Sequence, residues 1–435
     1  MRHPLVSRVR KLWHQGLRKA FASFPQSTRF AIYRSFVDCD PAPDKRLVLK
    51  IAETREELEA CFRLLHDAYV DAGFMKPDPS GMRVTMYHAL PTTTTLCALF
   101  DGEVVGTISL IRESVFGFPL QAIFDLTEVR EKKGHIAEVS ALAVHPKFRK
   151  TGGAILFPLM KFMYEYCTTF FDTRHLVIAV NPNRIEMYES LLFFQRLTEN
   201  AVASYDFANG APAVGASLDL HIAPAVFRQV YGRKPARRNL SAYFTEITLP
   251  NIVIPNRRYF TTNDPVMTPD LLDHFFNRCT RGFEQLDERK KVLLHSIYNL
   301  EEYGRVLPPV NAAAATQHPL RQHRRYSLKC PGDLALPEHT RPYSLNVIEL
   351  SNFGFQAYSQ LPLPLNVWGD ATIQLGRMET STVKAMAVRD KTNGYNGFYG
   401  FRLAEPDLPW RKCVKALEAG KTHEDLEHAT MFLTP

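Results

Sequence analysis

The spacing of apolar residues changes near residue 316 of this chain, and the change separates two kinds of fold. Between residues 47 and 222, apolar runs of strand length alternate with segments whose apolar residues recur every third or fourth position. That alternation predicts an α/β domain. After residue 316, apolar and polar residues alternate with a period of two in six short segments separated by turn residues. This second pattern predicts a small all-β barrel.

The two patterns also predict individual elements. In the first part we expect strands at 47–52, 95–100, 103–111, 135–144, 175–181 and 217–222, and helices at 54–72, 153–170 and 185–194. Asp101-Gly102 favours a type I′ hairpin turn between two of these strands. A helical stretch is expected at 268–303. The barrel strands are expected at 326–336, 344–350, 355–359, 365–375, 381–389 and 395–403, with a closing helix at 409–419.

At roughly 100–200 residues per domain, a chain of 435 residues holds more than one domain. We expect five segments: a basic amphipathic arm (1–45), the α/β domain (46–230), a partly helical connector (231–316), the barrel (317–420) and a polar tail (421–435).

Positive charge is concentrated at the start of the chain. Residues 1–37 contain eight arginines and lysines and no acidic residue, while the whole chain has a formal net charge of +8, so the rest is nearly neutral. Apolar residues recur at helical spacing between Leu5 and Phe24. Four interpretations stay open: a helix that packs its apolar stripe on the body, an amphipathic helix on anionic lipid, a docking surface for an acidic partner protein, and an organelle transit peptide.

Several classes of protein are excluded by composition. No stretch approaches the roughly 18 consecutive apolar residues of a membrane-spanning helix. The seven cysteines are scattered and form no C-x-x-C pair, which argues against a zinc site and a disulfide framework and favours a reducing cytoplasm. His423 and His428 match no zinc spacing, so no metal ligand is assigned.

A candidate phosphate-binding turn follows the strand at 135–144. It contains Arg149, Gly152, Gly153 and Ala154 and leads into an apolar helix. Unpaired backbone N–H groups at a helix N-terminus attract phosphate, and glycine lets the phosphate approach the backbone. Glycine-rich turns between strands and helices are common, so the weight of this motif depends on its context.

That context resembles the GNAT acyltransferase superfamily. The strand before the turn reads Glu138-Val-Ser-Ala-Leu-Ala-Val144, and the next strand ends in Asn-Pro-Asn at 181–183. A helix containing Tyr188 then ends at Phe193-Phe194, where Gly-Phe is usual in the superfamily. Within it, residues 47–222 are most similar to the N-acyl amino acid synthases, which are relatives of the acyl-homoserine lactone synthases.

The resemblance implies a GNAT-like fold and an activity. The activity is transfer of a long acyl chain from the phosphopantetheine thioester of acyl carrier protein, or from acyl-CoA, to the amine of an amino acid. The lactone synthases usually have Arg where this chain has Ala141, which argues against formation of homoserine lactone. A small-molecule acetyltransferase that uses acetyl-CoA is a further alternative.

Roles for individual residues follow from the same resemblance. The amine must lose a proton before it attacks a thioester, and Glu138 is the candidate base. Backbone N–H groups around Leu142 and Val144 are candidates for stabilising the oxyanion, and Tyr188 for protonating the leaving thiolate. The phosphate would be held by the turn of Arg149, Gly152, Gly153 and Ala154. The alternatives are that Glu138 is a half-exposed salt-bridge partner and that Tyr188 only packs.

A second motif lies in the barrel and resembles the PilZ domain, in which Arg-x-x-x-Arg and Asp/Asn-x-Ser-x-x-Gly bind cyclic di-GMP. Arg321 and Arg325 match the first motif, while Ser351 and Gly354 match the second. Glu349 stands where the family has Asp or Asn. Guanidinium groups bind phosphate bidentately and stack on guanine. The alternative is a solvated linker or a non-specific nucleic-acid patch.

We therefore expect a bacterial cytoplasmic enzyme, an N-acyltransferase with a C-terminal PilZ-type sensor of cyclic di-GMP. The expected partners are acyl carrier protein, an amino acid acceptor and cyclic di-GMP, with no nucleic acid and no tightly bound cofactor. Contact of the basic arm with the inner membrane is one of the open interpretations. The rival hypothesis is a non-enzymatic receptor whose GNAT-like domain binds a partner or an acyl carrier under control of cyclic di-GMP.

Overall fold

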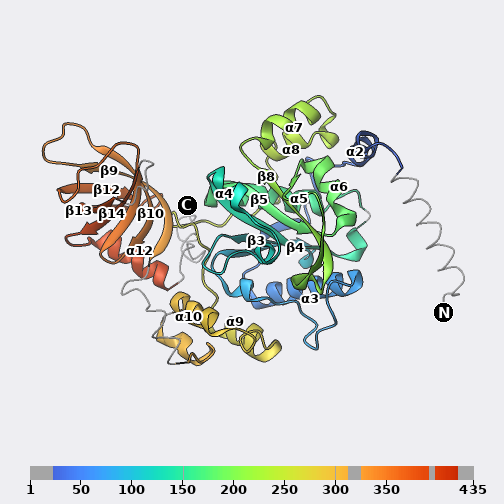
Figure 1. The fold of residues 1–435 in the computed structure, drawn as a ribbon, viewed down its shortest axis with the longest axis horizontal. Helices are drawn as coiled ribbons and strands as arrows, with labels where there is room; N and C mark the ends of the chain where they lie inside the picture. Colours follow the sequence, from blue (N-terminus) through green and yellow to red (C-terminus); the bar gives the residue numbers. More distant parts are fainter. Residues whose placement is uncertain (1–22, 150, 299, 312–324, 391–396, 420–435) are drawn as a thin grey trace, which may run out of the picture.

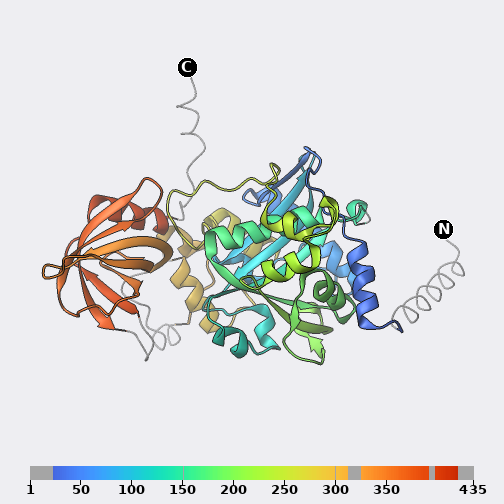
Figure 2. The same ribbon diagram turned by 90° about the horizontal axis from the view of Figure 1, so that it is seen from above.

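The computed structural model describes residues 23–149, 151–298, 300–311, 325–390 and 397–419. Figure 1 shows an α/β domain and a β-barrel at opposite ends of the molecule, and a helical segment from the middle of the chain lies between them. The same arrangement is visible from above in Figure 2. The α/β domain followed by a six-stranded barrel, which the sequence predicts, is confirmed.

The α/β domain is built on an eight-stranded sheet in the order β1-β2-β3-β4-β5-β8-β6, with β7 paired to β8. The strands β4 and β5 are parallel, and the other neighbours are antiparallel. The bounds are Leu47–Ile51 (β1), Thr93–Phe100 (β2), Glu103–Arg112 (β3), His135–Val144 (β4), Thr173–Val180 (β5), Gln195–Arg196 (β6), Val202–Tyr205 (β7) and Ala211–Asp219 (β8).

Two long helices cover opposite faces of this sheet (Figure 1). Helix α3 (Arg55–Ala72) packs on β2, β3 and β4, and α5 (Leu156–Phe171) packs on β1, β2, β3 and β5. A capping box fixes the start of α3, because the Thr54 hydroxyl accepts from the Glu57 amide while the Glu57 carboxylate accepts from the Thr54 amide. Helix α5 starts at Leu156, later than the expected position 153, so Pro158 falls in its first turn, where proline is tolerated.

Shorter helices complete the α/β domain. These are α2 (Gln26–Ser35), α4 (Thr127–Glu131), α6 (Pro182–Leu192), α7 (Ala223–Tyr231) and α8 (Leu240–Thr245). Helices α7 and α8 contribute to a core cluster with Phe157 and Met160 of α5. The hydropathy criterion for a membrane-crossing helix is met by no helix within the described ranges.

Two expectations for this part need correction. The final strand spans 211–219 instead of 217–222, and β7 precedes it where no strand is expected. The stretch 268–303 is not one helix, because it breaks into α9 (Pro269–Leu272), a π-helical turn (Asp273–Cys279) and α10 (Glu288–Ile297). Thr280 ends the π-helical turn in an extended conformation, and Asp287 starts the next helix by accepting from the Lys290 amide.

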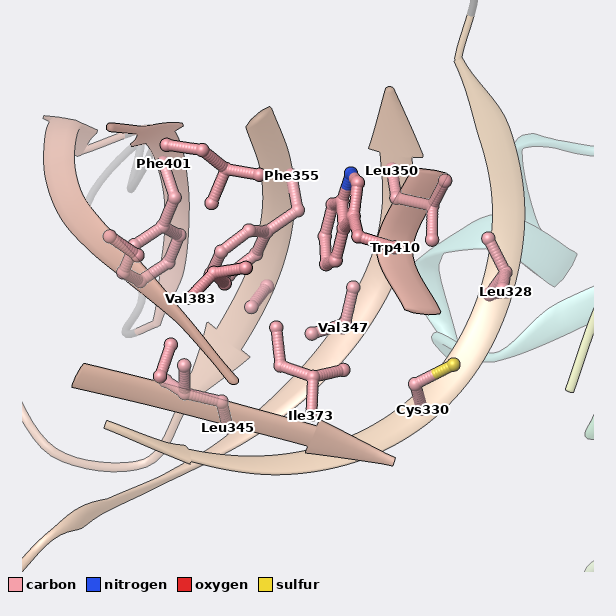
Figure 3. Packing of buried hydrophobic residues seen from close by; sticks show 14 of the residues in the cluster. Leu328, Cys330, Leu345, Val347, Leu350, Phe355, Ile373, Val383, Phe401 and Trp410 are labelled. Atoms are coloured by element: carbon pink, nitrogen blue, oxygen red, sulfur yellow. The ribbon is translucent and has the colours of Figure 1, made fainter. Parts of the chain in front are cut away.

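The barrel closes in the order β10-β11-β14-β13-β12-β9. Its strands span Tyr326–Ala335 (β9), Tyr343–Ser351 (β10), Gly354–Ser359 (β11), Trp368–Gln374 (β12), Thr380–Asp390 (β13) and Phe398–Leu403 (β14). The expected six strands are therefore present, and so is the closing helix, α12 (Leu408–Glu418). Trp410 of α12 lies among the core side chains of the barrel in Figure 3, where its ring contacts Phe355 and its Nε1 donates to the Ser351 carbonyl at 2.9 Å.

The connector residues 257–264 bond to both parts. The Phe260 amide donates to the Leu375 carbonyl of the barrel at 2.9 Å, and the Asp264 amide donates to the Pro91 carbonyl of the α/β domain at 2.9 Å. The Asp264 carboxylate is buried and accepts from Arg112 at 3.1 Å and from the Tyr166 hydroxyl at 2.5 Å. Since a buried carboxylate is stable only when it is paired and hydrogen-bonded, this cluster anchors the connector to the α/β domain.

Candidate active site

The parallel strands β4 and β5 separate halfway along their length. Their pairing runs from His135 opposite Thr173 to Glu138 opposite Val177 and continues no further within these fully described strands. A cavity of about 290 Å³ occupies the gap and is lined by residues just past the last pair, Val139–Leu142 on β4 and Ile178–Val180 on β5. The sheet is therefore open at this point.

The cavity is lined from both faces of the sheet. On the α5 face the wall is apolar and includes Leu142, Met163 and Ile178, which belong to the core packed under α5. On the opposite face the wall includes Tyr69, Glu138, Tyr205 and Phe207. A substrate that crosses the gap would thus have an apolar environment on one side and polar groups on the other.

Glu138 is the buried carboxyl group of this cavity. Its side chain is 2% exposed, and Oε2 accepts from the Leu120 amide at 3.0 Å. Burial raises the pKa of Glu138 to about 8, because the loss of hydration disfavours the charged carboxylate by more than the hydrogen bond from the Leu120 amide favours it. Within the described residues Glu138 forms no ion pair, so the salt-bridge alternative raised by the sequence is wrong.

Three tyrosines surround Glu138 and were not assigned as site residues from the sequence. Burial, followed by the charge of Glu138, raises the pKa of Tyr87 to about 12 and also raises that of Tyr205. The Tyr205 hydroxyl is buried and has no hydrogen-bond partner among the residues that the structure describes. Arg83 lies over the Tyr69 ring, with its guanidinium carbon 4.2 Å from the ring centroid. The hydroxyls of these tyrosines remain protonated at neutral pH and can donate to a substrate.

A β-bulge shapes the wall next to Glu138. In the register of β3 and β4, Thr107 faces Ala143 and Ser109 faces Ser140, so Ala141 and Leu142 together oppose Ile108. Ala141 adopts a φ of +55°, a left-handed conformation that non-glycine residues rarely take. A bulge leaves backbone groups of the extra residue outside the ladder. The bulge therefore determines in which direction the backbone N–H and C=O groups around Leu142 point at the cavity wall.

Tyr188 lines the same cavity from helix α6. Burial raises the pKa of Tyr188 to about 12, and its ring packs edge-on against Phe194 at 6.0 Å between centroids. It therefore combines the packing role considered for it with a position at the cavity. Phe193, which replaces the usual glycine, ends α6 at a φ of +60°, and its ring packs on Phe227.

The glycine-rich turn follows the end of β4 but does not line the cavity. Gly152 and Gly153 have φ values of +67° and +93°, which explains why glycine stands at both positions. The Arg149 Nε atom donates to the Val144 carbonyl at 2.8 Å, and the Asp38 carboxylate lies beside Gly152. Of the residues expected to contact the donor, Leu142 lines the cavity, whereas Val144, Arg149, Gly152, Gly153 and Ala154 are outside its lining.

The residues of the second motif meet on the barrel. Arg325 Nη1 and Glu349 Oε2 form an ion pair of 3.1 Å, and the Ser351 hydroxyl donates to the Gly354 carbonyl at 3.0 Å. A side chain at position 354 would place its Cβ 2.4 Å from the Phe401 carbonyl oxygen, so only glycine fits there. Arg321 lies outside the described residues.

Comparison with known proteins supports the acyltransferase interpretation. Residues 60–219 match the model of the family "N-acyl amino acid synthase FeeM". The matched region is an acyltransferase domain, so the chain is an acyltransferase enzyme. No curated protein sequence matches the chain.

Solved structures similar to the chain include FeeM itself, an N-acyl amino acid synthase from uncultured soil microbes, with 23% identity, a TM-score of 0.36, and coverage of 41% of this chain and 94% of that one. The CoA-dependent acyl-homoserine lactone synthase BjaI has 20% identity and a TM-score of 0.34, with 48% and 92% covered. YncA from Salmonella typhimurium, solved with its cofactor acetyl-CoA, has 16% identity and a TM-score of 0.30, with 40% and 95% covered.

Proposed function

We propose that the protein transfers a long-chain acyl group from the phosphopantetheine thioester of acyl carrier protein, or from acyl-CoA, to the amine of an amino acid. The observation that carries this proposal is the cavity through the sheet, which has Glu138 on one face and an apolar wall under α5 on the other. An acyl chain needs the apolar wall, and a protonated amine needs a base with a pKa near that of Glu138.

In the proposed mechanism the acceptor amine lies on the Glu138 face and loses its proton to that carboxylate, directly or through a water. The amine then attacks the thioester carbonyl in the gap between β4 and β5. Backbone N–H groups at the bulge around Leu142 and Val144 stabilise the oxyanion. Tyr188, kept protonated by burial, donates to the departing thiolate. The turn of Arg149, Gly152, Gly153 and Ala154 holds the donor phosphate.

The test is expression of the full chain in a host with ordinary fatty-acid metabolism, followed by mass spectrometry of lipid extracts. A new N-acyl amino acid in cells with the wild-type chain, absent with Glu138→Gln, is expected. Glutamine keeps an acceptor for the Leu120 amide, so the variant is expected to fold. An unchanged product with Glu138→Gln would remove Glu138 from the mechanism. No new lipid with either chain would favour the receptor hypothesis.

For the barrel we propose a second role, binding of cyclic di-GMP at Arg321, Arg325, Ser351 and Gly354, with an effect on acyl transfer. The pair of Arg325 and Glu349 supports it, because this guanidinium already binds an anionic group, which a phosphate can replace. Calorimetric titration of the full chain is expected to give tighter binding for Glu349→Gln than for wild type. Equal affinity of wild type and Arg325→Ala, or unchanged turnover with bound nucleotide, would contradict this role.

A further inference from the structure

One end of the active-site cavity is built outside the region of the family match. That match ends at residue 219, yet Ala223, Pro224 and Phe227 of α7 and Phe244 and Thr245 of α8 line the cavity. The family match thus accounts for the gap between β4 and β5 but not for the end of the cavity that faces α7 and α8. The group that binds at the α7 and α8 end of the cavity is therefore selected in part by residues that follow the matched region.

Aromatic rings form the wall at this end. The rings of Phe227 and Phe244 meet edge to face, with 5.9 Å between centroids, and Tyr164 of α5 contacts Phe244 at the same distance. Phe227 is 6% exposed, and its ring also packs on Tyr231 and Phe193, at 5.8 Å and 5.1 Å between centroids. Since interiors are close-packed, Phe227 cannot move aside without disturbing this cluster.

The chemistry of this end selects a hydrocarbon. Its lining side chains carry no formal charge, and burial raises the pKa of Tyr164, so that hydroxyl stays neutral. The wall between this end and the gap is continued by Met160, Met163 and Leu218, all apolar. A methylene buried against such a wall contributes about fourfold in affinity, whereas one that meets a ring in its path is excluded by overlap.

We propose that α7 and α8 set the acyl chain length of the donor, with Phe244 and Ala223 as the residues that limit how far the chain extends. This inference rests on the proposed function, because it assumes that the hydrocarbon is the acyl chain of a thioester. Phe244 is half-buried and lines the cavity, so its truncation lengthens the space without removing a fully buried core residue. Ala223 is buried at the start of α7, so a larger side chain there shortens the space.

The experiment measures kcat/KM of the full-length enzyme for a series of acyl thioester donors that differ by two methylenes. With Phe244→Ala, the ratio of kcat/KM for the donor one step longer than the wild-type optimum to that for the optimum is expected to rise about tenfold. With Ala223→Leu the optimum is expected to move to a shorter donor. Opposite movements by the two variants exclude a general loss of packing as the cause.

Phe193→Leu is the matched control. It removes a ring from the same aromatic cluster, but Phe193 does not line the cavity, so the donor optimum is expected to stay where it is. If the optimum stays unchanged in Phe244→Ala and Ala223→Leu, or moves equally in Phe193→Leu, the proposal is wrong.

Competition of saturated fatty acids against a fluorescent fatty acid supplies a readout that does not require turnover. Chain-length selectivity that follows the same variants supports the role of α7 and α8 even if no acceptor amine is acylated, in which case only the proposed function fails. If acyl is transferred but the donor preference is the same in the wild type and in these variants, the proposed function stands and the inference about α7 and α8 is wrong.

Discussion

A carboxyl group as buried as Glu138 affects stability as well as chemistry. Its pKa is raised from the ordinary 4.5 to about 8, so folding favours the protonated form. The contribution is fully present below pH 4.5 and is lost as the pH rises toward 8. A residue kept at this cost in stability, beside a cavity, has the properties of a functional group.

We therefore predict that Glu138→Gln is more stable than wild type at neutral pH. The difference in the free energy of unfolding should be small below pH 4.5 and should grow to the order of 3 kcal/mol at pH 7. Denaturant titrations of both chains across this range check the prediction. A difference that is constant with pH would mean that Glu138 has the same pKa in the folded and the unfolded protein.

At the residue scale, the sequence could predict only the part of the site that a linear motif contains. Glu138 and Tyr188 lie in the segments that resemble known acyltransferases, and both line the cavity. Tyr205 could not be found in this way, because it lies on β7, a strand of four residues with little alternation. Its proximity to Glu138 depends on the pairing of β7 with β8 and on no spacing along the chain.

At the scale of elements, the sequence could predict the hairpin turn but not the boundaries of the last strand. The hairpin at Asp101-Gly102 has φ values of +52° and +82°, as a type I′ turn requires, because two adjacent residues determine it. The expected start of β8 is six residues too late, since its first six residues, Ala-Pro-Ala-Val-Gly-Ala at 211–216, lack the large apolar side chains that indicate a strand. Pairing with β5 and β7 stabilises these residues as a strand, although their intrinsic strand propensity is low.

The bulge in β4 gives a prediction at this scale. Ala141→Val places a β-branched side chain in the left-handed conformation, which should cost about 1–2 kcal/mol of stability or flatten the bulge. Either response misdirects the backbone beside Glu138, so the loss of acyl transfer should exceed what the loss of folded protein explains. Ala141→Gly keeps the conformation accessible and serves as the control. Comparable activity per folded molecule in Ala141→Val and Ala141→Gly would mean that the conformation of the bulge does not affect catalysis.

At the scale of the whole molecule, the connector joins the enzyme to the barrel through contacts of different kinds. On the barrel side Tyr259 is buried in the barrel core, Phe260 forms backbone hydrogen bonds, and Arg258 forms an exposed ion pair with Glu379. On the α/β side a single carboxylate, Asp264, lies between two buried guanidinium groups, Arg112 and Arg257. A signal from the barrel that travels through residues 257–264 would therefore reach the Asp264 cluster.

Asp264→Asn should weaken the α/β domain selectively. It leaves two buried guanidinium groups without a counter-charge, a change that costs about 3–5 kcal/mol when one partner of a buried pair is removed. The control, Glu379→Gln, removes an exposed pair in the same segment and should cost about 1 kcal/mol or less. Of the three tryptophans, Trp368 and Trp410 lie in the barrel, so tryptophan fluorescence in a Trp13→Phe background follows the barrel alone.

Calorimetry of the same variants follows the whole chain, and comparison of the two measurements locates the effect. We expect Asp264→Asn to lower the calorimetric transition of the α/β domain while the fluorescence transition of the barrel stays within a degree or so of wild type, because the barrel closes its own sheet and Asp264 is not part of its core. If both transitions fall together, the prediction is wrong. The barrel and the α/β domain then unfold as one cooperative unit, and the Asp264 cluster couples them.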